Sequence, residues 1–451
     1  MNAEIRPVRT QAELGLVDVY TRSRQGLPGG SDIAAVRAAA FNHFALAGLP
    51  HPRVEAWRYT DLRRLMRDAK PLAASPDAAA KARVHDAGDV FAALGFRRLV
   101  ILNGSFVPEL SDLADLETGL TVRSMADALA LDEPLLSQGL GPTVPADDPA
   151  LALNTALAGD GVVVTVSPGV AIERPIHLVF ANSSETPAAM VTRSLVVVGG
   201  GARATIVETH EGRDRSDYQV NTVLQLVVGD EAEVDHIKIT REGNAAIHVA
   251  TLLANIGARA KFNEVGFTAG GAVVRNQMFV LLAAGGTEAN LRGLSLLADR
   301  QHADNTLAVD HAVAGCQSRE IFKAVVDDEA RAVFQGKITV RPQAQQTDAK
   351  MMSRALLLSD RAEADCKPEL EIFADDVQCG HGATTGTLDD QLKFYLMARG
   401  IPKKEAETLL IQAFAAEVLD TIAHEGIRDA LMDATVAWLE QRGQCDASSG
   451  K

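Results

Sequence analysis

A turn that ends in alanine recurs at nearly constant spacing through the middle of this chain. The alanines that end its four clearest copies are Ala204, Ala232, Ala260 and Ala289, so the steps are 28, 28 and 29 residues. Two looser copies occupy residues 328–332 and 360–364. An alternating apolar and polar run, typical of a β-strand, follows each turn. A unit of this length, with two strands and a glycine turn, predicts one coil of a β-solenoid.

The spacing and the composition favour a solenoid over a large sandwich or jelly roll, in which turns also recur. Coils of a solenoid stack about 4.8 Å apart, which leaves room only for a small residue at the corner. Aromatic residues make up 4% of the chain, so the core must consist mainly of Val, Leu, Ile and Ala. Seven short β-like runs without a convincing helix between them occupy residues 162–166, 176–180, 195–198, 222–228, 234–239, 247–253 and 277–282.

The sequence divides into four parts in a mainly β protein. We expect a helical or mixed N-terminal region over residues 1–155, a β-solenoid core over 156–386, a C-terminal helical domain over 387–443 and a disordered polar tail over 444–451. In the first part, a helix should begin near Ser31, with Ser31 or Asp32 as its cap. The aromatic pair Trp57 and Tyr59 is more typical of packing than of binding.

The charge and the cysteine content restrict the partners and the compartment. The formal net charge is −15 and the pI about 5.2, which argues against nucleic acid or an anionic membrane because phosphate binding needs clustered Lys and Arg. The first residues lack the basic and apolar regions of a signal peptide, and the apolar runs are far shorter than the roughly 20 residues that span a bilayer. The four cysteines have no pairing spacing, which suits a reducing compartment. We therefore expect a soluble cytoplasmic protein.

Residues 367–386 form the most informative short segment, and it opens as a strand. Leu370 and Ile372 alternate with Glu369 and Glu371, so the apolar and acidic side chains should face opposite ways. Asp375 continues the acidic side. The strand then leads into a glycine-rich run, which indicates a site at the end of a sheet.

Cys379 and His381 stand two residues apart in this glycine-rich run. In extended backbone that spacing aims a thiol and an imidazole at the same face, where they can share a metal or an iron–sulfur species. A buried thiol beside a hydrogen-bonded histidine is the more common reading of such a pair. Two ligands do not complete a tetrahedral site, so any further ligands must come from distant residues or from another chain.

Amphipathic helices are expected after residue 388. Their apolar positions are Leu392, Tyr395 and Leu396 in a first helix and Leu410, Phe414 and Val418 in a second. A group of helices this small has a thin core of its own. We therefore expect it to pack on the end of the solenoid, which needs a cap, or on another protein.

Several enzyme classes lack their motifs. Gly336 and Lys337 are followed by Ile338, so no Walker A sequence is present. Gly-x-Ser-x-Gly, a dinucleotide-binding glycine motif and His-Glu-x-x-His are also missing. A carbohydrate-active β-helix enzyme stays open as an alternative, with carboxylates such as Asp235, Glu264 and Asp327 on one face, although a secretion signal would be expected for it.

Four segments together resemble the SufD family of subunits of the bacterial SUF iron–sulfur assembly complex. They are residues 365–384, residues 389–401, Gln-Thr-Asp-Ala at 346–349 and Trp-Arg-Tyr-Thr-Asp at 57–61. The resemblance covers nearly the whole chain. The His381-Gly382 pair is similar to SufD, whereas the homologous SufB subunit usually has His-Glu. Cys366 stands where the family more often has Thr, so the resemblance gives it no role.

The resemblance implies a right-handed parallel β-helix in a non-catalytic scaffold subunit. It implies two partners, a homologous SufB-like subunit and a SufC-like ATPase that docks on the C-terminal helices, and a possible homodimer when the chain is isolated. His381 matches a residue that holds the nascent iron–sulfur cluster across the SufB interface, and Cys379 matches a cysteine of lesser role. That cluster is transient, and the resemblance implies no permanently bound cofactor. Glu369, Glu371, Asp375 and Asp376 would lie on the strand beside this site. A purely structural subunit, with SufB alone holding the cluster, is the alternative.

Overall fold

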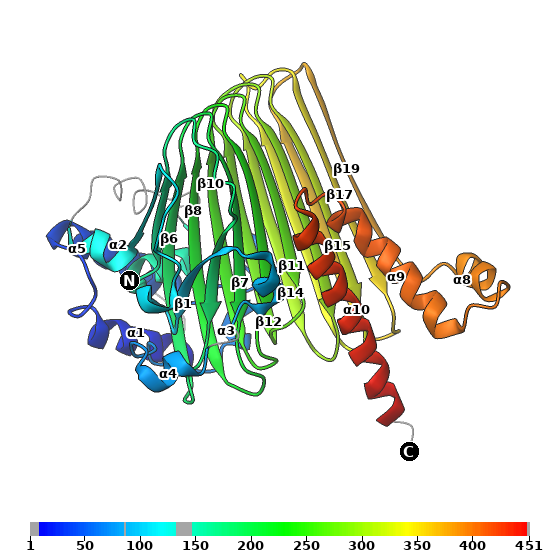
Figure 1. The fold of residues 1–451 in the computed structure, drawn as a ribbon, viewed down its shortest axis with the longest axis horizontal. Helices are drawn as coiled ribbons and strands as arrows, with labels where there is room; N and C mark the ends of the chain where they lie inside the picture. The colour runs from blue at the N-terminus through cyan, green and yellow to red at the C-terminus, as the bar shows by residue number, and fades with distance from the viewer. Residues whose placement is uncertain (1–8, 85–86, 132–146, 449–451) are drawn as a thin grey trace, which may run out of the picture.

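The computed structural model describes residues 9–84, 87–131 and 147–448, with side chains as far as Gln441. Two β-sheets of mainly parallel strands lie face to face, and each coil of the chain contributes one strand to each sheet (Figure 1). The ten-stranded sheet contains β1 (Arg97–Leu102), β2 (Ser105–Phe106), β5 (Ile176–Ala181), β7 (Arg203–Glu211), β9 (Glu233–Arg241), β11 (Lys261–Thr268), β13 (Glu288–Leu297), β15 (Gln317–Val326), β17 (Thr347–Leu357) and β19 (Val377–Gly386). The nine-stranded sheet contains β3 (Leu120–Ser124), β4 (Val162–Val166), β6 (Ala188–Val198), β8 (Tyr218–Val228), β10 (Ile247–Ile256), β12 (Val273–Leu282), β14 (His302–His311), β16 (Arg331–Val340) and β18 (Glu363–Ile372). The predicted β-solenoid is therefore confirmed.

Small residues form the corner where the coils stack, as predicted. Ala202, Ala232 and Ala260 each precede a strand of the ten-stranded sheet and are fully buried. A Cβ atom added to Gly229 would lie 2.6 Å from the backbone nitrogen of Gly200 in the coil below. No Cβ atom fits at that distance, so glycine is required at this position, where the backbones of successive coils meet.

The alignment of the repeat needs a correction at its first and last steps. Ala204 pairs with Val234, and Ala289 pairs with Phe262, so neither is the counterpart of Ala232 or Ala260. A shift of two residues leaves every side chain on the same face of a strand, and the sequence pattern therefore does not reveal it. The looser copies at 328–332 and 360–364 run into the first residues of β16 and β18 in the other sheet, so they form the opposite corner.

The N-terminal region closes one end of the solenoid and covers one of its sides. β2 and β3 pair antiparallel with β1 and β4, so the parallel stack ends there. The helices of this region are α1 (Gln11–Ser23), α2 (Ser31–Ala47), α3 (Leu62–Leu65), α4 (Ala78–Ala82), α5 (Met125–Ala130) and α7 (Pro149–Leu157). α1, α2 and α7 share an apolar cluster with Val191 and Val249 of the nine-stranded sheet. α2 begins at Ser31 as predicted, but neither predicted residue caps it, since Gly30 holds that position without a side-chain bond.

Trp57 fastens this region to the solenoid wall, which confirms the packing interpretation. Its side chain is fully buried, and its indole N–H donates to Oδ2 of Asp148 at 2.9 Å. The guanidinium of Arg275 in β12 lies 3.9 Å from the centroid of the indole ring and also pairs with Asp304 in β14. A buried cation is tolerated here because the ring and the carboxylate both compensate its charge.

The C-terminal helices lie along the side of the solenoid, not on its end as one of our expectations had it. They are α8 (Asp390–Met397), α9 (Lys403–Leu419) and α10 (Glu425–Ser448). α9 and α10 cross the outer face of the ten-stranded sheet (Figure 1), because Ile237, Phe267 and Leu296 make that face apolar. α10 continues to Ser448, into the predicted tail, since no glycine or proline interrupts residues 444–448. No helix in the described part of the chain is long and apolar enough to cross a membrane.

Shortening Leu431 tests whether α10 is an integral part of the fold. Leu431 is fully buried between α10 and the sheet, so Leu431→Ala should lower the free energy of unfolding by about 2–5 kcal/mol. Leu409→Ala, on the exposed side of α9, should change it by less than about 1 kcal/mol. Urea unfolding followed by fluorescence measures both, and equal losses in the two variants would contradict this packing.

Candidate functional site

The last coil of the solenoid is open. β18 and β19 are the terminal strands of their sheets, and no described strand pairs with their outer edges. Side chains that would be interior in any other coil, such as Cys366, Leu370 and Cys379, are only partly buried here. An edge strand presents unpaired N–H and C=O groups, and β-proteins normally cover or pair such an edge. The open coil is therefore suited to contact with another chain.

Cys379 and His381 both lie in β19 at this open end. The register sets Cys379 beside Ala349 and His381 beside Met351 of β17. Ala349 and Met351 belong to the buried core, so the alternation of the strands places Cys379 and His381 on the same, inward face, as predicted. The His381 side chain is exposed, whereas Cys379 is partly buried. Both residues border an open hollow of about 470 Å³ between β15, β17 and β19.

The protein environment keeps the Cys379 thiol protonated. Burial raises its pKa above the ordinary value, and the negative charges of Asp348 and Glu320 raise it further. A thiol binds metal as the thiolate, so Cys379 becomes a ligand only when a bound cation displaces its proton. Of the two side chains, His381 is the more accessible from solvent.

The predicted acidic residues lie near the pair but do not converge on it. Glu369 and Glu371 belong to β18 and form ion pairs with Lys367 at 3.1 Å and Lys337 at 2.8 Å. Their alternation with Leu370 places them on the outer face of the sheet, as predicted. Asp375 and Asp376 are exposed in the turn between β18 and β19. None of the four completes a ligand set with His381.

Glu320 is a buried acid beside the site that the sequence did not indicate. Its side chain is fully buried in β15, and it borders the same hollow as His381. Burial raises its pKa to about 8. The residue stands 61 positions before His381, and only the pairing of β15 with β17 and of β17 with β19 brings the two together. The sequence did contain one indication of Glu320, an acidic residue at a position where the alternation of the strand points inward.

The carboxylates of the alternative carbohydrate-active site do not meet. Glu264 points into the solenoid and hydrogen-bonds His236, whereas Asp235 accepts a bond from Asn263 at 2.7 Å on the outer face of the same sheet. Asp327 is buried in a turn after β15. The paired acids that glycoside hydrolysis needs are therefore not assembled from these residues.

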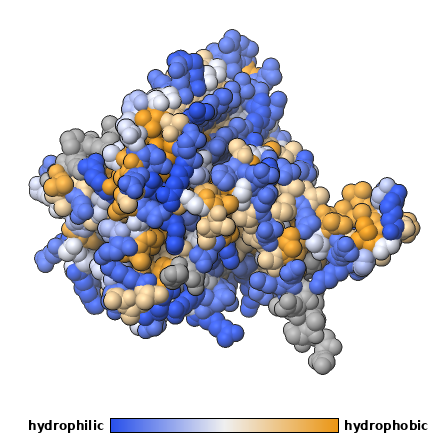
Figure 2. Space-filling view, in the orientation of Figure 1, coloured by the Kyte–Doolittle hydropathy of each residue, from blue (hydrophilic) through white to orange (hydrophobic). Residues whose placement is uncertain are grey.

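The predicted docking residues divide between an exposed helix and a packed one. Leu392 and Tyr395 of α8 are exposed, and Leu396 is half-buried. Leu410 and Phe414 of α9 are half-buried, while Val418 is buried against the sheet and offers no surface. Figure 2 shows hydrophobic side chains gathered on α8 where it projects beyond the solenoid, and the exposed Phe394 and Met397 belong to this group.

The structure is a parallel β-solenoid with one open coil, a thiol and imidazole pair in that coil and a projecting helix with exposed apolar side chains. The chain belongs to the SufBD family of the SUF system for iron–sulfur cluster assembly. The model of the SufBD core domain matches residues 179–414, and that of the SufBD N-terminal region matches residues 10–178.

Named relatives agree with this family. An iron–sulfur cluster assembly SufBD family protein of Synechocystis is 34% identical over 83% of this chain and 84% of its own length. The iron–sulfur cluster assembly protein SufD of Escherichia coli is 30% identical over 85% of this chain and 88% of its own length. SufD of Bacillus subtilis is 28% identical over 62% and 64%. The chain is therefore similar to SufD proteins along most of its length.

Replacing Glu320 should remove part of the pH dependence of stability. Between pH about 4.5 and about 8 the folded chain holds a proton on Glu320 that the unfolded chain has lost. Stability therefore falls as the pH rises, by up to about 1.4 kcal/mol per pH unit from this group. Glu320→Gln should flatten the fall, and the exposed Glu371→Gln should not. The midpoints of urea unfolding at about pH 6 and about pH 8 measure this fall in stability for the wild type and both variants. An unchanged slope in Glu320→Gln would refute the buried-acid assignment.

Proposed function

We propose that this chain is a non-catalytic scaffold subunit that pairs through its open coil with a homologous SufB-like subunit in the cytoplasm. The observation that carries the proposal is the asymmetry of the solenoid, closed by antiparallel strands at one end and unpaired at β18 and β19 at the other. A homologous subunit with the same kind of end offers strands of matching spacing. When the chain is isolated, a second copy of it can pair with the open coil in place of the homologous subunit, although more weakly, which accounts for a possible homodimer.

The cluster under assembly is held at this junction, with His381 as the ligand from this chain and Cys379 as an accessory ligand. An incomplete pair on an exposed strand suits cargo that must later leave, because no closed tetrahedral set retains it. The partner supplies the remaining ligands. In the competing, purely structural interpretation the partner alone holds the cluster and both side chains serve only packing.

The SufC-like ATPase docks on α8 and on the adjacent exposed part of α9. Supporting this assignment, Leu392, Phe394 and Tyr395 stand exposed on a short helix that is not packed on the sheet. Apolar and aromatic side chains of this kind form the centres of protein interfaces. No nucleotide-binding motif is present in the chain itself, so the partner provides ATP hydrolysis.

His381→Ala should lower the cluster yield of the assembled complex at least about tenfold, since loss of even a supporting residue weakens metal sites by about 10–100-fold. Iron and acid-labile sulfide per complex measure the yield. Gln378→Ala, on the opposite face of the same strand, serves as the control and should have no effect. Normal yield in an intact complex that lacks both His381 and Cys379 would favour the purely structural interpretation.

Tyr395→Glu should weaken ATPase binding by about 2 kcal/mol or more, or about 30-fold in Kd, because it buries a charge in an apolar interface. Leu46→Glu, which alters an apolar and still more exposed side chain on α2, is the control. Titration calorimetry with the purified ATPase measures both. Equal binding of the two variants would place the docking surface elsewhere.

A further inference from the structure

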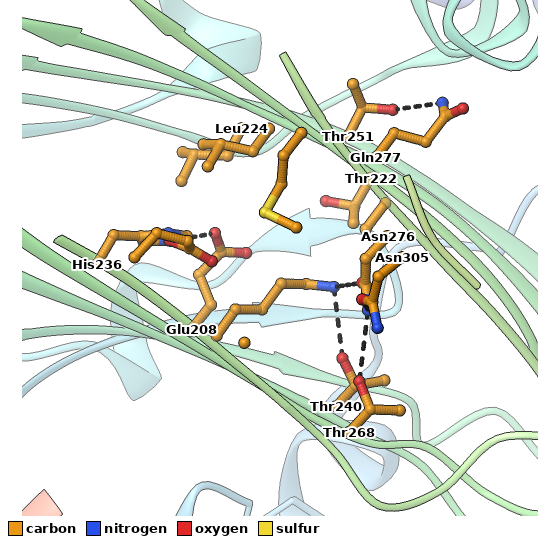
Figure 3. Close-up of a pocket in the computed structure, with 16 residues that line it drawn as sticks. Glu208, Thr222, Leu224, His236, Thr240, Thr251, Thr268, Asn276, Gln277 and Asn305 are labelled. Carbon is orange, nitrogen blue, oxygen red and sulfur yellow. Dashed lines mark hydrogen bonds and ion pairs between the residues drawn. The ribbon is translucent and has the colours of Figure 1, made fainter. Parts of the chain in front are cut away.

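The largely apolar inside of the solenoid has a polar edge beside the C-terminal half of β7. In β7 the inward side chains begin with Ala204 and Ile206 and continue with Glu208 and His210, all of them buried. Figure 3 shows the polar part of a neighbouring cavity, with Glu208 beside His236 on one side and Asn276 and Asn305 on the other. Buried charges are costly unless they are paired, so this polar edge requires an explanation.

One part of the edge is fully paired. Nε2 of His236 lies 2.8 Å from Oε1 of Glu208, and Nδ1 contacts the carboxylate of Glu264. Burial alone would lower the pKa of His236, but the two carboxylates raise it to about 10. The three residues form a satisfied ion triad across successive coils.

A second group lies where the chain turns from β9 into β10, and it is not fully paired. His210, Glu242 and His248 are fully or almost fully buried, and one possible ligand atom from each lies within 4.8 Å of the others. Glu242 accepts from Tyr218 at 2.6 Å through Oε2 and contacts Nδ1 of His248 at 2.9 Å through Oε1. Two imidazoles and one carboxylate are a ligand set of zinc and of non-haem ferrous iron.

His210 supplies the observation that points to a ligand. Its Nε2 lies 2.9 Å from Oε2 of Glu208, so the proton of the neutral ring is on Nε2 and is donated to that carboxylate. Nδ1 then carries a lone pair, and this buried atom has no hydrogen-bond partner among the described residues. Phe180 stacks on the ring at 4.4 Å and fixes its plane. A carboxylate that holds the far nitrogen of a histidine is the usual support of a metal-binding imidazole.

Charge and space in the group also suit a cation. Glu208, Glu242 and Glu264 are three buried carboxyl groups. Besides His210 and His248, the basic groups in contact with this network are His236 and Lys238. The amine of Lys238 lies 3.1 Å from Nε2 of His248, so the metal-free ring carries its proton on Nδ1 and donates it to Glu242. A bound ion displaces that proton. A cavity of about 20 Å³ adjoins His210 and Glu242, which is enough for one water molecule.

We propose that His210, Glu242 and His248 bind one divalent first-row transition metal ion inside the solenoid, with a water molecule from the adjoining cavity as a further ligand. Glu208 and Tyr218 act as positioning residues that orient His210 and Glu242. The site goes beyond the proposed function, which concerns the open coil and a cluster that leaves. An enclosed three-residue set is suited to an ion that stays, in contrast to our expectation of no permanently bound cofactor.

The competing interpretation is a metal-free network in which a proton on Glu242 balances the charge and water occupies the cavity. The untagged full-length chain, freed of metal with a chelator, distinguishes the two. We expect it to take up one equivalent of Co²⁺ with the visible absorption of a low-symmetry site, and to bind Zn²⁺ and, under anaerobic conditions, Fe²⁺ in titration calorimetry. The Zn²⁺ and Fe²⁺ arms determine which ion the site prefers. Failure of the wild-type chain to bind any of the three would overturn the proposal.

Isosteric variants place the ion at this group. Glu242→Gln keeps the shape of the side chain and should lower the affinity at least about 100-fold, and Glu208→Gln should lower it about 10–100-fold. His177→Gln, which removes a buried histidine of the same sheet outside the group, and His381→Ala should leave the affinity unchanged. Metal should also raise the melting temperature of the wild-type chain and not that of Glu242→Gln. Equal metal binding by the wild type and Glu242→Gln would refute the assignment. Loss of binding in His381→Ala alone would assign the ion to the open coil.

Discussion

Parallel backbone pairing between coils is the interaction on which the rest of this structure depends. Every coil from β5 and β6 onward uses the coil before it as a template and serves as the template for the next. A stack of this kind could be extended by further coils, so its two ends determine where other strands can pair with it. Antiparallel β2 and β3 stop the stack at the N-terminal end. At the other end the strands simply finish, and their unpaired backbone groups remain.

The C-terminal helices explain why that end stays open. An amphipathic helix goes where it buries most apolar surface, and the outer face of the ten-stranded sheet offers Ile237, Ile239 and Phe267. A cap across the open coil would bring α9 against β19, whose exposed positions are mainly Gln, His, Gly and Thr. α9 and α10 therefore pack on the side of the solenoid, and the glycine-rich last strand is left uncovered.

The sequence predicted the features that depend on local periodicity. Alternation placed Cys379 and His381 on one face, and recurring small residues indicated the coils. What could not be predicted depends on how coils of unequal length align, since only the register shows that Glu320 and His381 lie on either side of Met351. Glu264, in contrast, could have been placed correctly from the alternation within its own strand. It is an inward residue paired with His236, and its parity with Phe262 of the core was the available clue.

The connection between β19 and α8 gives the two proposed partner sites a mechanical relation. β19 ends at Gly386 and α8 begins at Asp390, so only residues 387–389 separate the strand that carries His381 from the exposed helix. α9 and α10, by contrast, are fixed to the sheet through Val418 and Leu431. A chain this short transmits a displacement almost fully, because three extended residues span at most about 11 Å. A partner that moves α8 therefore pulls on the edge strand itself, and the rigid side of the solenoid supplies the fixed frame against which that strand can be shifted.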